Sequence, residues 1–407
     1  MNVLALNWRD PRHPEAGGAE VHLFEILERW TARGATVTAL TTSFPGAAPE
    51  DRAGSVRVLR RGSWWNGNWA AAAAVRGELS GERFDLVVED LNKLPYFSPL
   101  YAKAPVLVVV PHLFGTTAFA EAPWPVAATV WAHERLIPLV YRRQSFLAIS
   151  ESTRRDLGAR GVPRERVAVS VCGLDHERYR PGGEKTAHPS VLYVGRLRRY
   201  KGVDVLIEAF ARLVPGLPDA RLTVIGDGPH RAALERRAAA LGLGERVTFT
   251  GFVPAEEKVR RLQSSWVSAL PSPKEGWGLT VVESNACGTP VVASRSPGLV
   301  DSVRDGESGL LVPHGDAAAL AEALLSLLTD ADRRARLGRG GLAWASRFTW
   351  DRCADEAWQV ARAVVDRTAL PDFAPASAVE LGSARGAGAT SMAASTREGP
   401  SARQRSA

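Results

Sequence analysis

Short apolar runs alternate with amphipathic segments along the first half of the chain. A segment from about residue 19 to residue 33 has helical spacing of its apolar positions and ends at Gly34. The runs that we predict as strands are Val3–Leu6, Val37–Thr41, Leu86–Val88, Val106–Val110, Phe146–Ser150 and Val167–Val171. Continuously apolar strands that are separated by helices indicate a parallel sheet with helices on both faces.

The same alternation begins again in the second half. A helix from about residue 202 to residue 213 follows the first strand of this half. The predicted strands are Ser190–Val194, Arg221–Ile225, Val247–Thr250, Val267–Leu270, Val291–Val292 and Gly309–Val312. Residues 180–189 are rich in Pro and Gly, which is typical of a linker. The pattern therefore predicts an α/β protein with two doubly wound parallel sheets in tandem, over residues 1–180 and 181–349.

Length and composition agree with two globular domains and a tail. The 407 residues fit two domains of ordinary size, and 45% hydrophobic residues supply a core for each. Residues 374–407 consist mainly of Ala, Ser, Gly and Arg, with almost no large apolar residue. Such a segment buries too little surface to order itself, so we predict a disordered tail. Binding of the tail to an anionic surface is the alternative.

The charge and the cysteines limit the class of protein. The net charge of +7 suits an anionic ligand, an anionic membrane surface or nucleic acid, although an Arg-rich coding bias explains it equally well. No nucleic-acid-binding motif accompanies the charge. Cys172, Cys287 and Cys353 form no CxxC pair, which argues against a zinc site or a disulfide framework. The first apolar run is too short for a signal peptide, and no apolar stretch reaches the roughly 18 residues that span a bilayer. We therefore expect a cytoplasmic protein.

Two carboxylates, Glu275 and Glu283, flank a segment that begins as a glycine-rich loop and continues as a helix. Gly276 and Gly278 let a ligand approach the backbone, and the amides that open the helix favour an anion such as phosphate. Glu275 is then placed to hold sugar hydroxyls. Glu283, about two turns into the helix, is placed to accept both hydroxyls of a ribose. The plainer interpretation is an ordinary helix start followed by a surface Glu.

A basic loop, residues 195–202, follows the first strand of the second half and carries Arg196 and Lys201. Ligands of open α/β sheets bind outside the carboxyl ends of strands, where these two cations would lie. Fixed cations can stabilise the charge that gathers on a departing nucleoside diphosphate without a metal. A solvated basic loop is the alternative interpretation.

Two weaker signals lie in the first half. Gly17 and Gly18 occupy a strand-to-helix turn, where backbone can approach phosphates, although any tight turn uses such a pair. His112 closely follows a predicted strand, where it can bond a transferred sugar or its acceptor or serve as an ordinary loop residue.

Together, and in this order, these segments resemble the retaining glycosyltransferases of family 4. Their architecture, called GT-B, has two Rossmann-like domains with the donor cleft between them. The resemblance covers residues 2–366, and the spacing of Glu275 and Glu283 is its most specific element. It implies that the second domain binds a nucleotide diphosphate sugar and that the first binds the acceptor. It also implies that the last helix, residues 350–366 with Asp351 in its first turn, crosses back to the first domain.

The resemblance assigns roles to single residues. His112, Arg196, Lys201 and Glu275 form the implied catalytic set. The implied donor-binding set is Gly17, Gly18, Arg196, Lys201, Val253, Glu275, Gly276, Gly278, Leu279 and Glu283. Within it, Arg196 and Lys201 would bind the diphosphate, Glu283 the ribose and Glu275 the sugar, while the backbone around Val253 would lie by the base. The implied mechanism is front-face substitution with retention of configuration, without a metal or another cofactor. A UDP-sugar and a GDP-sugar both remain open, as does the acceptor.

The first half also carries aromatic residues beside cations. One group is Arg57, Arg60, Arg61, Trp64, Trp65 and Trp69, and the other is Trp124, Trp131, Arg135, Leu136, Tyr141, Arg142 and Arg143. Such pairs suit sugar faces or a membrane interface. The hypothesis is that the first domain docks on an anionic membrane and takes a lipid-linked or other amphiphilic acceptor. The alternative is that several of these Trp residues belong to the core.

Three other functions compete with transfer. A nucleotide-sugar epimerase shares the architecture but does not explain the two carboxylates as directly. A glucan phosphorylase-like enzyme would need a pyridoxal Lys and a much longer chain. A sugar-binding scaffold with a decayed site is disfavoured because Arg196, Lys201, Glu275 and Glu283 are all present.

Overall fold

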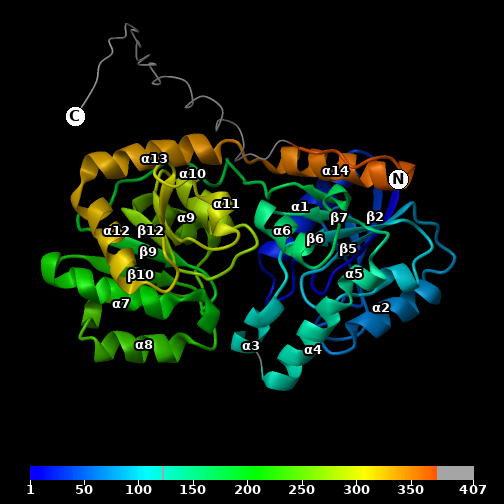
Figure 1. The fold of residues 1–407 in the computed structure, drawn as a ribbon, viewed down its shortest axis with the longest axis horizontal. Coiled ribbons are helices and arrows are strands. Elements are labelled where there is room, and N and C mark those ends of the chain that lie inside the picture. Colours follow the sequence, from blue (N-terminus) through cyan, green and yellow to red (C-terminus); the bar gives the residue numbers. More distant parts are fainter. Residues whose placement is uncertain (122, 374–407) are drawn as a thin grey trace, which may run out of the picture. The chain divides into compact units, whose positions relative to one another are not determined.

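The computed structural model describes residues 1–121 and 123–373, and residues 1–373 form one compact unit. The tail for which we predicted disorder, residues 374–407, lies outside the described residues. Within the described part, two separate α/β sheets follow one another along the chain (Figure 1). This is the predicted fold class.

The first sheet has eight strands in the order β3-β4-β2-β1-β5-β6-β7-β8. Their bounds are β1 Asn2–Leu6, β2 Thr36–Thr41, β3 Glu50–Ala53, β4 Val56–Arg60, β5 Leu86–Asp90, β6 Val106–Val110, β7 Ser145–Ala148 and β8 Val167–Val169. All neighbours are parallel except β3 and β4, which pair antiparallel at the edge. The prediction missed this edge hairpin because its strands are charged and alternate only weakly.

The helices around the first sheet are α1 Gly18–Ala32, α2 Gly67–Arg76, α3 Ala118–Glu121, α4 Trp124–Arg135, α5 Ile137–Val140 and α6 Glu151–Ala159. The predicted strand Phe146–Ser150 ends earlier, at Ala148, because Ser150 caps α6 by accepting a hydrogen bond from the Thr153 amide at 3.1 Å. The core of this half lies where apolar side chains of β1, β5 and β6 meet the helices.

The second sheet has six parallel strands in the order β11-β10-β9-β12-β13-β14. Their bounds are β9 Ser190–Val194, β10 Arg221–Ile225, β11 Val247–Gly251, β12 Val267–Leu270, β13 Val291–Ser294 and β14 Gly309–Val312. The helices are α7 Val203–Leu213, α8 Arg231–Ala240, α9 Ala255–Ser264, α10 Leu279–Ala286, α11 Leu299–Ser302, α12 Ala317–Thr329 and α13 Ala331–Ala345. The strands lie close to the predicted ranges because their apolar runs are bounded by Gly and Pro.

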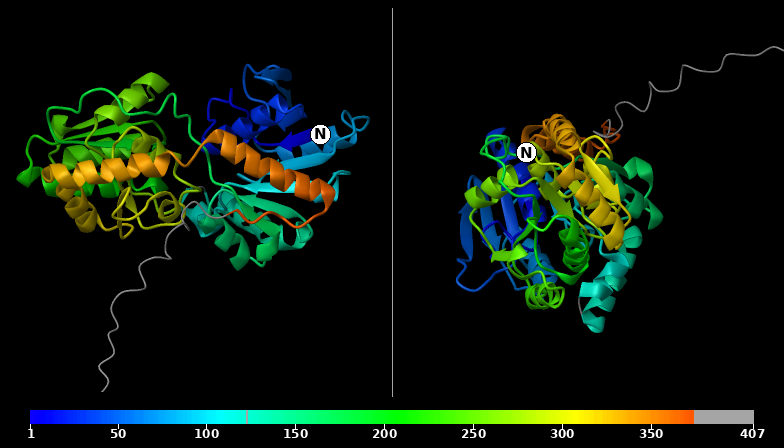
Figure 2. Two further views of the ribbon diagram at one scale, coloured as in Figure 1. Left: turned by 90° about the horizontal axis from the view of Figure 1, so that it is seen from above. Right: turned by 90° about the vertical axis from the view of Figure 1, so that its left-hand side faces the viewer.

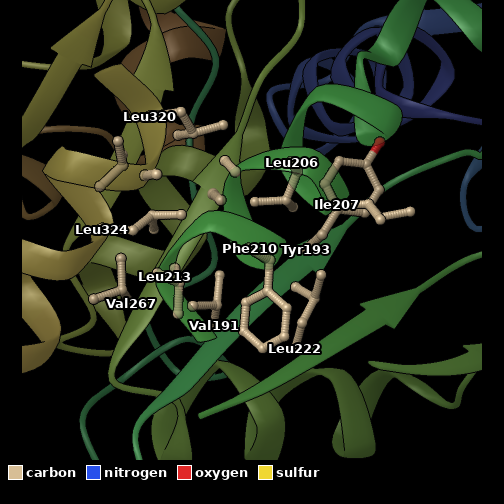
Figure 3. Close-up of a cluster of buried hydrophobic side chains, with 14 of the residues drawn as sticks. Val191, Tyr193, Leu206, Ile207, Phe210, Leu213, Leu222, Val267, Leu320 and Leu324 are labelled. Atoms are coloured by element: carbon tan, nitrogen blue, oxygen red, sulfur yellow. The ribbon is translucent and has the colours of Figure 1, made fainter. Parts of the chain in front are cut away.

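Helix α7 shows how this core forms. Its apolar residues recur at helical spacing, so that they pack with side chains of β9 and β10, and the helix also lies against α12. Figure 3 shows Leu206, Ile207, Phe210 and Leu213 of α7 among strand side chains such as Leu222. The tight packing holds the loop that precedes α7, which carries Lys201, in a fixed position.

The last helix, α14 Trp350–Asp366, lies against α1 of the first half (Figures 1 and 2). The indole nitrogen of Trp30 donates to the Ala354 carbonyl at 3.1 Å, and Asp351 in the first turn pairs with Arg29 at 2.7 Å. The buried Glu356 accepts a hydrogen bond from Ser170 at 2.8 Å. A helix that follows the second sheet therefore contributes to the core of the first half.

Candidate active site

The basic loop with Lys201 and the glycine-rich loop with Glu275 meet because β9 and β12 are neighbouring parallel strands. The short 3-10 helix η4 Arg199–Lys201 follows β9, and the loop with Glu275 follows β12. The Lys201 ammonium lies 2.6 Å from a Glu275 carboxylate oxygen, and the two side chains are 13% and 17% exposed. Residues 74 positions apart in the chain therefore form one ion pair at the carboxyl edge of the sheet.

The pair keeps both groups charged. Burial alone would lower the pKa of Lys201, but the Glu275 carboxylate outweighs it and raises that pKa above its ordinary value. Burial alone would raise the pKa of Glu275, but Lys201 outweighs it and lowers that pKa. A fixed cation is thus present at every physiological pH.

Glu283 forms a second pair of the same kind. Its carboxylate lies 2.6 Å from the ammonium of Lys258 on α9, which also bonds the Tyr179 hydroxyl at 3.1 Å. Helix α10 begins at Leu279, so Glu283 lies just over one turn into it, and the predicted two turns were wrong. Lys258 is not among the residues predicted for the site, because a single Lys in an amphipathic helix carries no local signal.

The glycines of this loop have a role that the sequence did not reveal. A Cβ on Gly276 would lie 2.7 Å from the Pro111 carbonyl oxygen and 2.9 Å from Ile149, so glycine is needed for packing against the first half. Gly278 has φ +91° where the chain turns into α10. Protein therefore fills the space beside Gly276, where we expected a ligand to approach the backbone. The first backbone amides of α10 follow directly after Gly278.

The turn that contains Gly17 and Gly18 lies close to Arg196 and to Leu279 at the start of α10. An added Cβ on Gly18 would be 3.2 Å from Leu279, and one on Gly17 would be 3.8 Å from the Arg196 guanidinium. The Gly17 amide donates to the Glu20 carboxylate at 2.7 Å, so in this structure that amide has a protein partner. The start of α1 is thereby brought close to the loop with Arg196 and to the start of α10.

His112 follows β6 and contacts Phe114, with the ring centroids 4.9 Å apart. Burial, with the positive charges of Lys274, Lys201 and Arg196, lowers the pKa of His112 to about 4, against the opposing effect of Glu275. The imidazole is therefore neutral at pH 7 and lies within electrostatic reach of the Lys201–Glu275 pair.

Val253 follows β11 and packs against a separate cluster that includes Tyr179 and Ile225. That cluster also includes Val259 and Leu262 of α9 and Ala286 of α10.

A pocket of about 480 Å³ adjoins the site. Its lining comes from both halves and consists of Ser152, Thr153, Arg155, Asp156, Lys274, Glu275, Arg295, Ser296, Pro297 and Val300. Lys274 pairs with Asp156 at 2.8 Å across it. Of the predicted site residues, Glu275 alone lines this pocket.

The aromatic and basic residues singled out in the first half differ in their exposure to solvent. Trp64, Trp65, Trp69 and Trp124 are 80%, 69%, 81% and 73% exposed, and Trp131 is 37% exposed. Tyr141 and Arg60, in contrast, are buried: Tyr141 bonds Glu89, and Arg60 pairs with Asp10 at 2.8 Å. The predicted docking surface therefore loses these two residues, whose polar groups the core satisfies.

Residues 1–121 and 123–373 contain neither a side-chain cluster suited to a metal ion nor a helix suited to crossing a bilayer. They hold no cluster of three or more His, Cys, Asp or Glu side chains arranged for a metal ion. In the same ranges, each helix is too short or too polar to cross a bilayer.

Two sequence families match the chain. "Glycosyltransferase Family 4" matches residues 16–178, and "Glycosyl transferases group 1" matches residues 176–344. A protein of Nocardia farcinica named D-inositol 3-phosphate glycosyltransferase is 36% identical over 273 residues, which are 63% of this chain and 59% of that protein. A GDP-mannose-dependent alpha-(1-6)-phosphatidylinositol monomannoside mannosyltransferase of Mycolicibacterium smegmatis is 37% identical over 48% of this chain and 56% of its own length. The chain thus spans little more than half the length of these relatives.

Solved structures share the fold. Sucrose-phosphate synthase of Thermosynechococcus elongatus superposes with a TM-score of 0.79 at 23% identity, covering 90% of this chain and 100% of that one. HepE of Anabaena, solved with UDP and glucose, gives a TM-score of 0.71 at 21% identity, covering 88% and 98%.

Proposed function

Because the chain belongs to the glycosyltransferases of group 1 and family 4, with the GT-B fold, we propose that it transfers a hexosyl group from a UDP- or GDP-sugar to an acceptor with retention of configuration. The observation that carries the proposal is the largely buried Lys201–Glu275 pair beside the start of α10. A cation that is held there stabilises the charge on the departing diphosphate.

The proposed mechanism assigns each charged group one task. Arg196 and Lys201 bind the diphosphate and neutralise the charge that develops as the glycosidic bond breaks. The acceptor hydroxyl attacks from the face that the diphosphate leaves, and a phosphate oxygen takes its proton. Glu275 positions Lys201 and accepts hydrogen bonds from sugar hydroxyls, and the neutral His112 bonds the transferred sugar. The protein supplies position and charge rather than a general base, and neither a metal nor another cofactor takes part.

In this proposal, donor binding depends on the second ion pair, Lys258–Glu283. Glu283 accepts the ribose hydroxyls, and Lys258, which also donates to the Tyr179 hydroxyl, holds its carboxylate in place. The backbone after β11, at Val253, lies by the base. The first amides of α10, at Leu279, meet the phosphates, since the amino end of a helix favours an anion. Uridine and guanosine donors both fit, because backbone groups would do most of the base selection.

The test is a calorimetric titration of the full chain with UDP, GDP and ADP without metal, followed by the sugar conjugates of whichever binds. We expect one nucleotide to bind and to raise the melting temperature by mass action. Slow release of nucleotide from its sugar conjugate should accompany binding, because water replaces a missing acceptor. Binding without release, in the presence of a broad set of acceptors, would favour the non-catalytic scaffold. A folded sample that binds none of them would overturn the proposal.

We further propose that the first half docks on an anionic membrane. Trp124, Val126 and Leu139, on α4 and α5, are 73%, 50% and 64% exposed, and Arg135 lies 4.8 Å from the ring centroid of Trp131. Exposed apolar side chains beside arginines, in a chain of net charge +7, suit a surface of anionic lipids. Docking would bring a lipid-linked or amphiphilic acceptor to the first half.

Vesicle co-sedimentation tests the docking. The wild type should sediment with vesicles rich in phosphatidylglycerol at low salt, and replacing Trp124 and Trp131 together by serine should weaken binding by about tenfold or more, since each aromatic side chain buries a large apolar area. Phe252→Ser is the matched control, because Phe252 is 76% exposed but belongs to the second half. Equal binding of both variants, or no sedimentation of the wild type, would rule the surface out.

A further inference from the structure

Helix α6 of the first half contacts the second half at two places. Near its start it lies against α11, where the Ser152 amide donates to the Asp301 carboxylate at 3.0 Å (Figure 1). One turn further, the Asp156 carboxylate lies 2.8 Å from the ammonium of Lys274. Lys274 directly precedes Glu275, so this ion pair joins α6 to the loop that carries Glu275.

Asp156 has a second cationic partner at the end of its own helix. Its other carboxylate oxygen accepts a hydrogen bond from the Arg160 guanidinium at 3.1 Å. Arg160 in turn lies 3.3 Å from the carboxylate of Glu134 on α4. We call Lys274, Asp156, Arg160 and Glu134 the charge row. Its two acids and two bases balance one another, so the charge row links side chains rather than presenting a net charge to a ligand.

The charge row ends at the loop that carries His112. Glu134 is 1% exposed and accepts hydrogen bonds from the backbone amides of Phe114 at 2.6 Å and Gly115 at 2.8 Å. A buried carboxylate with these partners is satisfied only while the loop keeps its backbone conformation. The Phe114 ring contacts the His112 imidazole, so fixing this loop also restricts His112.

The proposed chemistry does not use the charge row, although the row connects the loops that carry His112 and Glu275. These two loops also meet directly, where Gly276 packs against the Pro111 carbonyl oxygen. A single backbone contact leaves two loops free to tilt about it. A second attachment a few residues away fixes their relative orientation as well as their separation.

We propose that the charge row positions the loop with His112 and the loop with Glu275 relative to each other, so that both side chains reach the transferred sugar together. The inference rests on the proposed function, which assigns these two side chains to the sugar. Asp156, Arg160 and Glu134 are then positioning residues, because each acts through a loop that it holds. Loss of the charge row should slow the reaction without weakening nucleotide binding, which depends on other residues of the second half.

The test compares Asp156→Asn with Asp366→Asn. Asp366 is the matched control, because it also pairs with an arginine one turn away on its helix, Arg362, at 3.1 Å. Release of nucleotide from the sugar conjugate, with water as the acceptor, measures kcat, and calorimetry measures the affinity for the nucleotide. We expect Asp156→Asn to lower kcat by about 10–100-fold, the usual cost of misplaced reacting groups, at unchanged nucleotide affinity. Asp366→Asn should change neither.

An Asp156→Asn variant with wild-type kcat would overturn the inference. A variant in which kcat and nucleotide affinity fall together would overturn it as well, because Asp156 would then act on the donor site as a whole. The Asp156 and Lys274 side chains are partly exposed, so these variants should fold, and their melting temperatures verify this.

A double-mutant cycle tests whether Asp156 and Lys274 act through their ion pair. The double variant Lys274→Met, Asp156→Asn should be no slower than the slower single variant, because either substitution already breaks the link. Lys274→Arg keeps the charge and should retain most of the wild-type turnover. Losses that multiply in the double variant, or a Lys274→Arg variant as slow as Lys274→Met, would contradict the proposal.

Amide hydrogen exchange of the unliganded protein gives a readout that needs no turnover. Lys274→Met should raise exchange at the Phe114 and Gly115 amides, at the other end of the charge row, because a loop that loses an attachment opens more often. Unchanged exchange there would overturn the inference, even in an active enzyme. A wild type that neither binds nor cleaves any nucleotide sugar would instead overturn the proposed function, and the positioning of the sugar with it.

Discussion

Lys201→Met is expected to lower kcat by on the order of 10²–10³-fold, the usual effect of removing one group that stabilises developing charge. The Lys201 side chain is 13% exposed and its ammonium is paired with Glu275, and that carboxylate raises the pKa of Lys201, so the charge is present throughout the working range. Methionine keeps the length of the side chain but removes the charge. Steady-state release of nucleotide at saturating donor measures the effect.

The effect of Lys201→Met on the stability of the protein needs a separate control. Removing Lys201 leaves the carboxylate of Glu275 buried without its cation, which costs about 3–5 kcal/mol. The double variant Lys201→Met, Glu275→Gln replaces both charges and should regain most of that stability without regaining turnover. Lys185→Met is the matched control, because Lys185 is another partly buried lysine of the second half, bonded to Ser265 and Thr289. Wild-type turnover in Lys201→Met would remove this residue from the mechanism.

Glu283→Gln is expected to weaken the binding of the donor nucleotide by about 10–100-fold, the effect of losing one or two hydrogen bonds to a charged group. The Glu283 side chain is 10% exposed and lies 2.6 Å from Lys258. Glutamine keeps its shape but accepts only through one oxygen. Because the ribose is remote from the bond that breaks, KM for the donor should rise while kcat at saturation changes little.

Calorimetry with the nucleotide found to bind gives the affinity directly. The double variant Lys258→Met, Glu283→Gln tests whether an unpaired Lys258 contributes to the loss. Glu257→Gln is the control on the neighbouring helix, because Glu257 pairs with Arg260 and Arg261 at the surface. An unchanged affinity in Glu283→Gln would refute the ribose role.

The two ion pairs, Lys201–Glu275 and Lys258–Glu283, also show which features a local sequence pattern does not reveal. Glu275 and Glu283 stood out because their spacing around a glycine-rich helix start is a local pattern. Lys258 did not, since it gains meaning from a residue that is distant in the chain: Lys258 meets Glu283 25 positions away. Burial and the pairing of charges are properties of the folded chain, and a sequence pattern does not contain them.

The order and type of the main elements could be predicted from the sequence. Apolar runs such as Val106–Val110 are bounded by turn residues, so β6 has the predicted bounds, as does α14, and α7 differs from prediction by a single residue. Elements that lack a strong apolar period were missed, as with the charged hairpin of β3 and β4. The boundaries of elements differed from the prediction where a capping side chain sets them, as at Ser150.

Periodicity and composition by themselves determined a parallel α/β architecture that restarts near residue 190, and motif spacing determined which carboxylates to suspect. These are short-range features, because a strand or a helix start depends on residues within a few positions of one another. Only the tertiary structure decided which lysine pairs with which carboxylate, that Tyr141 and Arg60 are buried while Trp64 and Trp124 are exposed, and that Gly276 packs on Pro111. Strand order brings distant loops to one edge of a sheet, and the charges and packing there depend on that order.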